Sequence, residues 1–133
     1  VPLPAEGPGD DWTLTRHRAA FLAFLKFLKG NLGGQTSLRV DNTWATQDML
    51  LTAIGQFAIP DRVIRERNLG PALSDLAAEA GVDAPALSSG FTVPAQFALS
   101  EVVTDDINAA AEAAYRRDYL MFGFSRWTPD QAA

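Results

Sequence analysis

The stretch from Pro60 to Gly81 constrains the fold of this chain most, because its pattern changes from one backbone type to another within a few residues. Residues 62–65 follow a proline and combine arginines with two β-branched side chains, which is typical of a short strand. From Leu69 onward, apolar residues recur at helical spacing, with Asn68 available to cap the helix and Gly81 to end it. The stretch therefore predicts a strand at 62–65, a charged turn and a helix over 69–80.

Helices are also predicted on both sides of this unit, because apolar residues recur there at three- and four-residue intervals. The three predicted helices cover residues 13–29, 42–59 and 100–122. Asn42 or Thr43 can cap the second helix, and Gly123 can close the last one. The expected fold class is therefore mainly α with one short strand.

Proline and glycine divide the chain into three parts. Residues 1–11 contain three prolines and two glycines, which predicts a flexible, extended leader. Residues 12–127 are expected to form a single, mostly helical region, and residues 128–133 a frayed tail.

Composition excludes several classes of function. A net charge of -5 argues against nucleic acid and anionic membrane surfaces, because both are bound through clustered Lys and Arg. The sequence contains no apolar run of about 18 residues, so no membrane span is expected. The absence of cysteine excludes disulfides, thiolate nucleophiles and cysteine-based zinc sites. It leaves the cellular compartment open, with the cytoplasm slightly favoured.

Few residues suggest catalysis or metal binding. His17, the single histidine, lies between Arg16 and Arg18, whose charges oppose its protonation and repel a metal ion. A solvated surface histidine is therefore favoured over a general base. The acidic pairs at 10–11 and 105–106 occupy predicted helix starts, where the dipole favours negative charge, so capping is favoured over an acid/base pair or a metal site. No metal site is expected.

Two further groups of residues have open interpretations. Glu66 lies between Arg65 and Arg67 at the end of the predicted strand, a position where α/β proteins often place functional groups. An ion-paired hinge is nevertheless the favoured interpretation.

The second group lies on neighbouring turns of the last predicted helix and consists of Tyr115, Asp118, Tyr119 and Phe122. Their spacing favours core packing over ligand contact, with Asp118 accepting a buried hydrogen bond.

The order and spacing of these pieces resemble the C-terminal half of the family 2 sulfotransferases, the carbohydrate sulfotransferase-like group. The resemblance covers about Phe21 to Phe124. Its matching pieces are Trp44 and Gln47, then residues 63–69, then Tyr115, Asp118, Tyr119, Phe122, Gly123 and Phe124. The chain departs from the family pattern at Thr43 and Thr46, which stand where the family usually has His and Pro. Any role of that His in acceptor binding is therefore lost here.

This resemblance implies the C-terminal portion of a P-loop-kinase-like α/β fold and a sulfuryl transfer from 3′-phosphoadenosine 5′-phosphosulfate (PAPS) to a hydroxyl, usually of a carbohydrate. The family's donor-binding loop is not among these 133 residues. We therefore expect an acceptor-side portion that binds no cofactor alone and is inactive on its own.

The resemblance also assigns roles to individual residues. It implies that Trp44 is an apolar platform for the acceptor, Gln47 a neutral hydrogen-bonding group, and Glu66 a brace for basic residues. A second set forms a structural motif: Tyr115, Asp118, Phe122 and Gly123. No catalytic residue is assigned.

The expected partner is the missing N-terminal half of such an enzyme or a second copy of this chain. A lone strand at 62–65 leaves its backbone groups unpaired, so pairing between two copies predicts a homodimer. The alternative function is a noncatalytic helical module that binds a partner protein.

Overall fold

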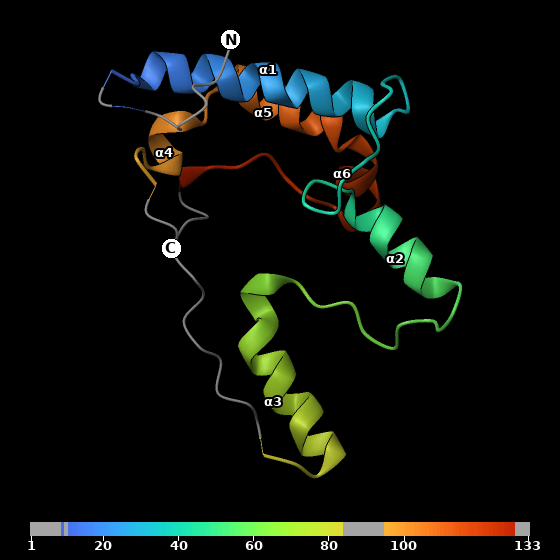
Figure 1. The fold of residues 1–133 in the computed structure, drawn as a ribbon. Helices are drawn as coiled ribbons and strands as arrows, with labels where there is room; N and C mark the ends of the chain where they lie inside the picture. Colours follow the sequence, from blue (N-terminus) through green and yellow to red (C-terminus); the bar gives the residue numbers. More distant parts are fainter. Residues whose placement is uncertain (1–8, 10, 84–94, 130–133) are drawn as a thin grey trace. The chain divides into compact units, whose positions relative to one another are not determined.

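The computed structural model describes residue 9, residues 11–83 and residues 95–129 (Figure 1). Its secondary structure is helical. In chain order the helices are α1 (Leu14–Leu32), α2 (Gln47–Gly55), the 3₁₀ helix η1 (Glu66–Asn68), α3 (Leu69–Ala80), α4 (Leu99–Val102), α5 (Asp105–Ala114) and α6 (Arg116–Phe122). The predicted leader and tail fall largely outside the described residues. So do residues 84–94 of the connection between α3 and α4.

The chain forms two compact units. The first consists of Val1–Ala53 together with Ala95–Ala133, and the second of Ile54–Pro94. The predicted single helical region over residues 12–127 stays a prediction.

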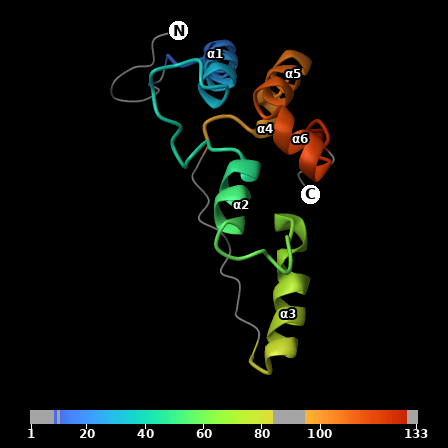
Figure 2. The same cartoon turned by 90° about the vertical axis from the view of Figure 1, so that its right-hand side faces the viewer.

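The first unit is built on the pairing of α1 with α5 (Figures 1 and 2). Leu25 and Leu28 of α1 are buried together with Ile107 of α5 and Val102 of α4. These positions follow the helical spacing of the sequence, so one stripe of each helix faces the common core. Partly buried side chains surround this core: Leu14, Phe21, Leu22, Phe27, Leu32, Trp44, Phe97, Ala110, Ala111, Ala114 and Tyr115.

Helix α1 confirms the predicted helix over 13–29 and extends it to Leu32. Thr13 caps its start, because the hydroxyl oxygen accepts a hydrogen bond from the Arg16 N–H. At the other end, the N–H of Gly33 donates to the carbonyl of Lys29. The glycines after this helix thus act as a helix stop.

The predicted continuous helix over 100–122 is wrong, because the backbone leaves helical geometry twice. Thr104 is extended, with φ -124° and ψ 169°, and separates α4 from α5. Tyr115, with φ -106° and ψ 27°, separates α5 from α6. A β-branched residue is readily extended, and Thr104 stands as the N-cap residue before Asp105 and Asp106. Gly123 closes α6 in the left-handed conformation, as predicted, with φ 61°.

In the second unit, helix α3 confirms the predicted helix, and Gly81 ends it with φ 67°. The predicted strand at 62–65 is wrong, since these residues form no strand pairing within the described part of the chain. Arg65 is extended, with φ -78° and ψ 141°, but a single extended segment has no ladder partner. The homodimer expected through a strand edge loses its structural basis.

The sequence therefore predicted the mainly α class correctly, whereas the short strand is absent from the described residues. The charged residues placed at its end instead form η1, whose first residue is Glu66.

Replacing Leu28 by alanine tests the α1–α5 core. Leu28 is 2% exposed, so Leu28→Ala should lower the free energy of unfolding by about 2 to 5 kcal/mol. Leu120→Ala is the matched control, because Leu120 is 73% exposed in the same unit and its loss should change little. Urea unfolding followed by circular dichroism measures both, and equal effects would contradict the proposed core.

Candidate functional site

Asp118 joins α6 to the start of α2. Its two carboxylate oxygens accept hydrogen bonds from the backbone N–H groups of Gln47, at 2.8 Å, and Asp48, at 2.9 Å. Asp118 is 3% exposed, so these bonds form away from water. The first N–H groups of a helix have no partner within the helix, and a carboxylate there also meets the positive end of the helix dipole. This confirms the buried hydrogen bond predicted for Asp118.

Thr46 completes the cap of α2. Its hydroxyl oxygen accepts a hydrogen bond from the N–H of Met49 at 3.1 Å. The first three N–H groups of α2 are therefore all paired, two with Asp118 and one with Thr46. The start predicted at Asn42 or Thr43 is wrong, because Thr43 instead donates from its N–H and hydroxyl to the Asp41 carboxylate in a turn before the helix. These two hydrogen bonds hold the pKa of Asp41 below its ordinary value.

Trp44 lies against α1. Its ring meets Phe24 and Phe27 edge to face, with centroid separations of 6.1 and 6.5 Å. Its indole N–H donates to the side-chain oxygen of Asn31 at 3.0 Å. The ring is partly buried, so only part of its surface is open to a ligand.

Asn31 holds the connection between α1 and α2. Its amide nitrogen donates to the hydroxyl of Thr36 and to the carbonyl of Leu38, both at 2.8 Å, while its oxygen accepts from Trp44. At 1% exposed, it is the most buried large side chain among the described residues. A buried amide with every group paired fixes the path of the loop.

Tyr115, the residue before α6, makes a second link to the segment before α2. Its phenol O–H donates to the carbonyl of Trp44 at 3.0 Å. Burial raises the pKa of Tyr115, and the nearby negative charge of Asp118 raises it further. The phenol is therefore kept protonated and able to donate.

The remaining predicted residues lie in different settings. Gln47 is the first residue of α2, with an exposed side chain, while Phe122 and Gly123 end α6. The Phe122 ring packs against Phe124, with centroids 5.7 Å apart. Glu66 is exposed and belongs to the second unit, whereas the first unit holds the group formed by Trp44, Gln47, Tyr115 and Asp118. We call that group of four residues the α2 cap cluster.

Several contacts around the α2 cap cluster were missed by the sequence analysis. Arg117 pairs with the buried carboxylate of Asp48, with 2.7 Å between Nε and Oδ2, and adds a further link between α6 and α2. Thr46 and Asn31 were also missed. The Thr46-x-x-Met49 spacing is that of a cap and its N3 residue, whereas nothing in the sequence distinguishes Asn31 from an exposed helical asparagine.

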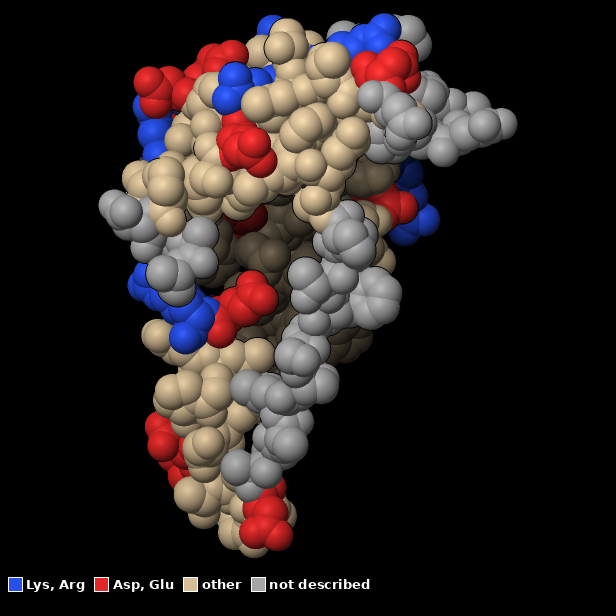
Figure 3. Space-filling model, turned by 90° about the vertical axis from the view of Figure 1, so that its left-hand side faces the viewer, with Lys and Arg blue, Asp and Glu red and all other residues tan. Residues whose placement is uncertain are grey.

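Charged side chains of both signs alternate on the face drawn in Figure 3, without a broad basic area among the coloured residues. The predicted absence of nucleic-acid binding stays a prediction. Within the described ranges, no three His, Asp or Glu residues gather as metal ligands. None of the described helices has the length and apolar character needed to cross a membrane.

No family model, curated protein or solved structure matches this chain.

Replacing Asp118 by alanine tests the link between α6 and α2. Asp118→Ala should lower the free energy of unfolding by about 2 to 3 kcal/mol, because two buried N–H groups lose a charged acceptor. Amide hydrogen exchange at Gln47 and Asp48 should speed up with it. Asp105→Ala, which removes an exposed carboxylate, is the control and should cost less than about 1 kcal/mol. Unchanged exchange at both amides would contradict the cap.

The raised pKa of Tyr115 predicts a loss of stability at alkaline pH. Tyrosine in the unfolded chain ionises near pH 10, whereas the folded protein resists ionisation of Tyr115, so the stabilisation is present below about pH 10 and lost as pH rises through the folded pKa. In Tyr115→Phe, unfolding by urea between pH 8 and 11.5 should show a smaller alkaline loss than in the unmodified chain. Tyr119→Phe is the comparison, and it should also reduce the alkaline loss of stability, since burial raises the pKa of Tyr119 as well. Parallel pH curves for Tyr115→Phe and the unmodified chain would contradict the prediction.

Proposed function

We propose that this chain is the acceptor-side, C-terminal portion of a sulfotransferase, which transfers a sulfuryl group from PAPS to a hydroxyl of a carbohydrate. One observation carries this proposal. Two of the three pieces that match the family pattern are 71 residues apart in the sequence, yet they are joined by the hydrogen bonds from Tyr115 to Trp44 and from Gln47 to Asp118. A chance likeness of short, separate motifs gives no reason for them to meet.

The acceptor would lie beside the start of α2. The Gln47 side chain is exposed there and offers a neutral amide that can donate to and accept from sugar hydroxyls. Trp44 contributes the remaining exposed part of its ring. The turn just before it borders a hollow of about 300 Å³ lined by Arg39, Val40, Asp41 and Asn42. In this proposal Glu66 braces basic residues, and no nucleophile or general base is assigned.

The donor would be held by the other half of the enzyme. PAPS carries phosphate and sulfate groups, and such anions are bound through clustered Lys and Arg. This chain has a net charge of -5. The partner that the proposal requires is therefore a basic, donor-binding polypeptide, and the chain alone transfers no sulfate.

The alternative function, a noncatalytic helical interaction module, is favoured by a different observation. Phe57 is 92% exposed, Ile59 85% and Val63 63%, in one connecting segment of the second unit. Exposed apolar residues close together in a chain are typical of a surface that binds another protein.

Binding of the acceptor provides the test of the proposed function. Unsulfated N-acetyllactosamine and chondroitin oligosaccharides are titrated into the ¹⁵N-labelled chain and followed by NMR. We expect shifts at the Gln47 amide and the Trp44 indole, with a Kd on the order of 1 mM, weakened at least fivefold in Gln47→Ala. Gln35→Ala, which truncates an exposed glutamine of the same unit, should leave the affinity unchanged.

Two results would overturn the proposal. Failure of both oligosaccharides to shift the α2 cap cluster removes the acceptor site. Thermal stabilisation by adenosine 3′,5′-bisphosphate shows that the donor site lies within this chain, because a ligand of the native state raises its melting temperature. Sedimentation equilibrium tests the interaction module. Self-association of the chain that is lost in Phe57→Ser would favour that alternative.

A further inference from the structure

His17 lies at a junction that the proposed function does not use. The indole N–H of Trp12 donates to His17 Nδ1 at 3.2 Å, and the two rings meet edge to face at 83°. Trp12 is 6% exposed. His17 is partly buried, so the predicted solvated surface histidine is wrong. The hydrogen bond requires that Nδ1 carry no proton, because only the bare nitrogen can accept.

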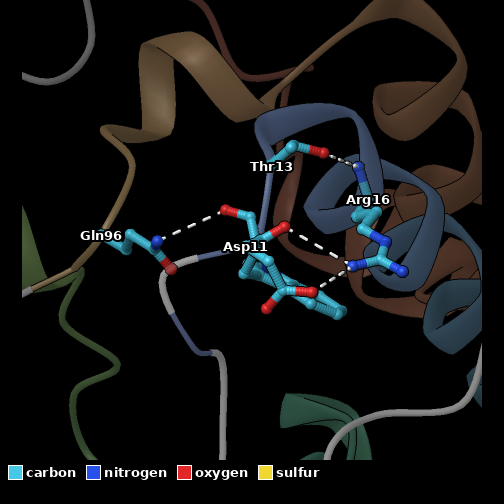
Figure 4. Close-up of polar contacts among 5 residues, drawn as sticks. Asp11, Thr13, Arg16 and Gln96 are labelled. Carbon is cyan, nitrogen blue, oxygen red and sulfur yellow. Dashed lines mark hydrogen bonds and ion pairs between the residues drawn. The ribbon is translucent and has the colours of Figure 1, made fainter.

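A third segment packs on the same pair. The ring of Phe97 meets the His17 ring at 5.3 Å between centroids, and the Gln96 amide donates to the Trp12 carbonyl at 3.4 Å. Figure 4 shows Gln96 reaching toward the backbone between Asp11 and Thr13. The imidazole of His17 therefore contacts the residues before α1 and the residues before α4.

The charged residues next to His17 in the sequence have partners of their own. Arg16 and Arg18 flank His17 on α1. The carboxylate of Asp11 pairs with Arg16 at 2.9 Å, a contact that Figure 4 draws, and the Arg18 guanidinium donates to the backbone carbonyl of Glu101. Among the described residues, no carboxylate forms an ion pair with His17.

The other carboxylates near this junction have partners of their own. The carboxylate of Glu101 accepts the N–H of Ala98 at 2.8 Å. On α5, the carboxylate of Asp106 accepts the hydroxyl of Thr104, and this bond lowers the pKa of Asp106, with a further contribution from the charge of Arg18. Among the described residues, a protonated His17 therefore has no ion-paired carboxylate of its own.

We propose that Trp12, His17 and Phe97 form a proton-controlled latch, in which neutral His17 holds Trp12 against α1 and protonation releases it. A proton from solvent takes the Nδ1 lone pair, so the Trp12 N–H loses its acceptor and faces another N–H. Because a buried donor without a partner is unfavourable, the indole is then more stable in contact with water. Imidazole is the side chain that ordinarily changes its protonation between about pH 5 and 8, so this is the range in which the latch is tested.

The latch is tested on the full chain by NMR between pH 8 and pH 5. The indole N–H signal of Trp12, assigned with Trp12→Phe, should shift with the same midpoint as the His17 ring protons. Its hydrogen exchange, corrected for the pH dependence of intrinsic exchange, should accelerate at least tenfold. His17 is the single histidine, so the ring signals are unambiguous.

The control variants separate the latch from other titrations. In His17→Gln, the amide oxygen can accept the indole N–H at every pH, so the Trp12 signal should stay constant. Asp11→Asn removes the carboxylate that pairs with Arg16 and should leave the midpoint within about 0.5 pH unit, because an exposed ion pair contributes little. A Trp12 signal that stays constant while His17 titrates would overturn the proposal, as would an equal shift in His17→Gln.

Discussion

The cap that Asp118 places on α2 is the interaction that attaches this helix to the first unit. A helix of nine residues is too short to be stable by itself, so its free N–H groups need partners from elsewhere. Asp118 supplies two from α6, about 70 residues along the chain, and Thr46 supplies the third. One carboxylate thereby fixes where α2 begins and which way it leaves the α1–α5 pair.

The same cap explains why the motif residues resemble a functional site while acting largely on structure. The polar groups of Asp118 and Tyr115 form hydrogen bonds with the backbone around Trp44. These groups therefore stabilise the fold and are not available to a ligand. What they leave exposed is the Gln47 side chain. The proposed acceptor site is therefore a small polar surface on a rigid support, a common arrangement in proteins that position a substrate.

Sequence reasoning succeeded where local signals decide the structure. The apolar stripe of α1 and the left-handed glycines at 81 and 123 predicted elements that the structure confirms. It failed where distant contacts decide. The start of α2 depends on a carboxylate in α6, and the break at Thr104 competes with a helical pattern on both sides. For the candidate site, the family resemblance indicated Trp44, Tyr115 and Asp118, but only the fold shows which atoms meet.

The side-chain amide of Asn31 forms hydrogen bonds with three residues of the connection between α1 and α2, namely Thr36, Leu38 and Trp44. Hydrogen bonds to Asn31 therefore attach both the residues before position 40 and Trp44 after it to α1. These attachments do not depend on the peptide bonds at position 40. A protease cut near Val40, whose neighbours Arg39 and Asp41 are exposed, would leave two pieces that still recognise each other. The loop is accordingly a natural place to split this protein into complementing fragments.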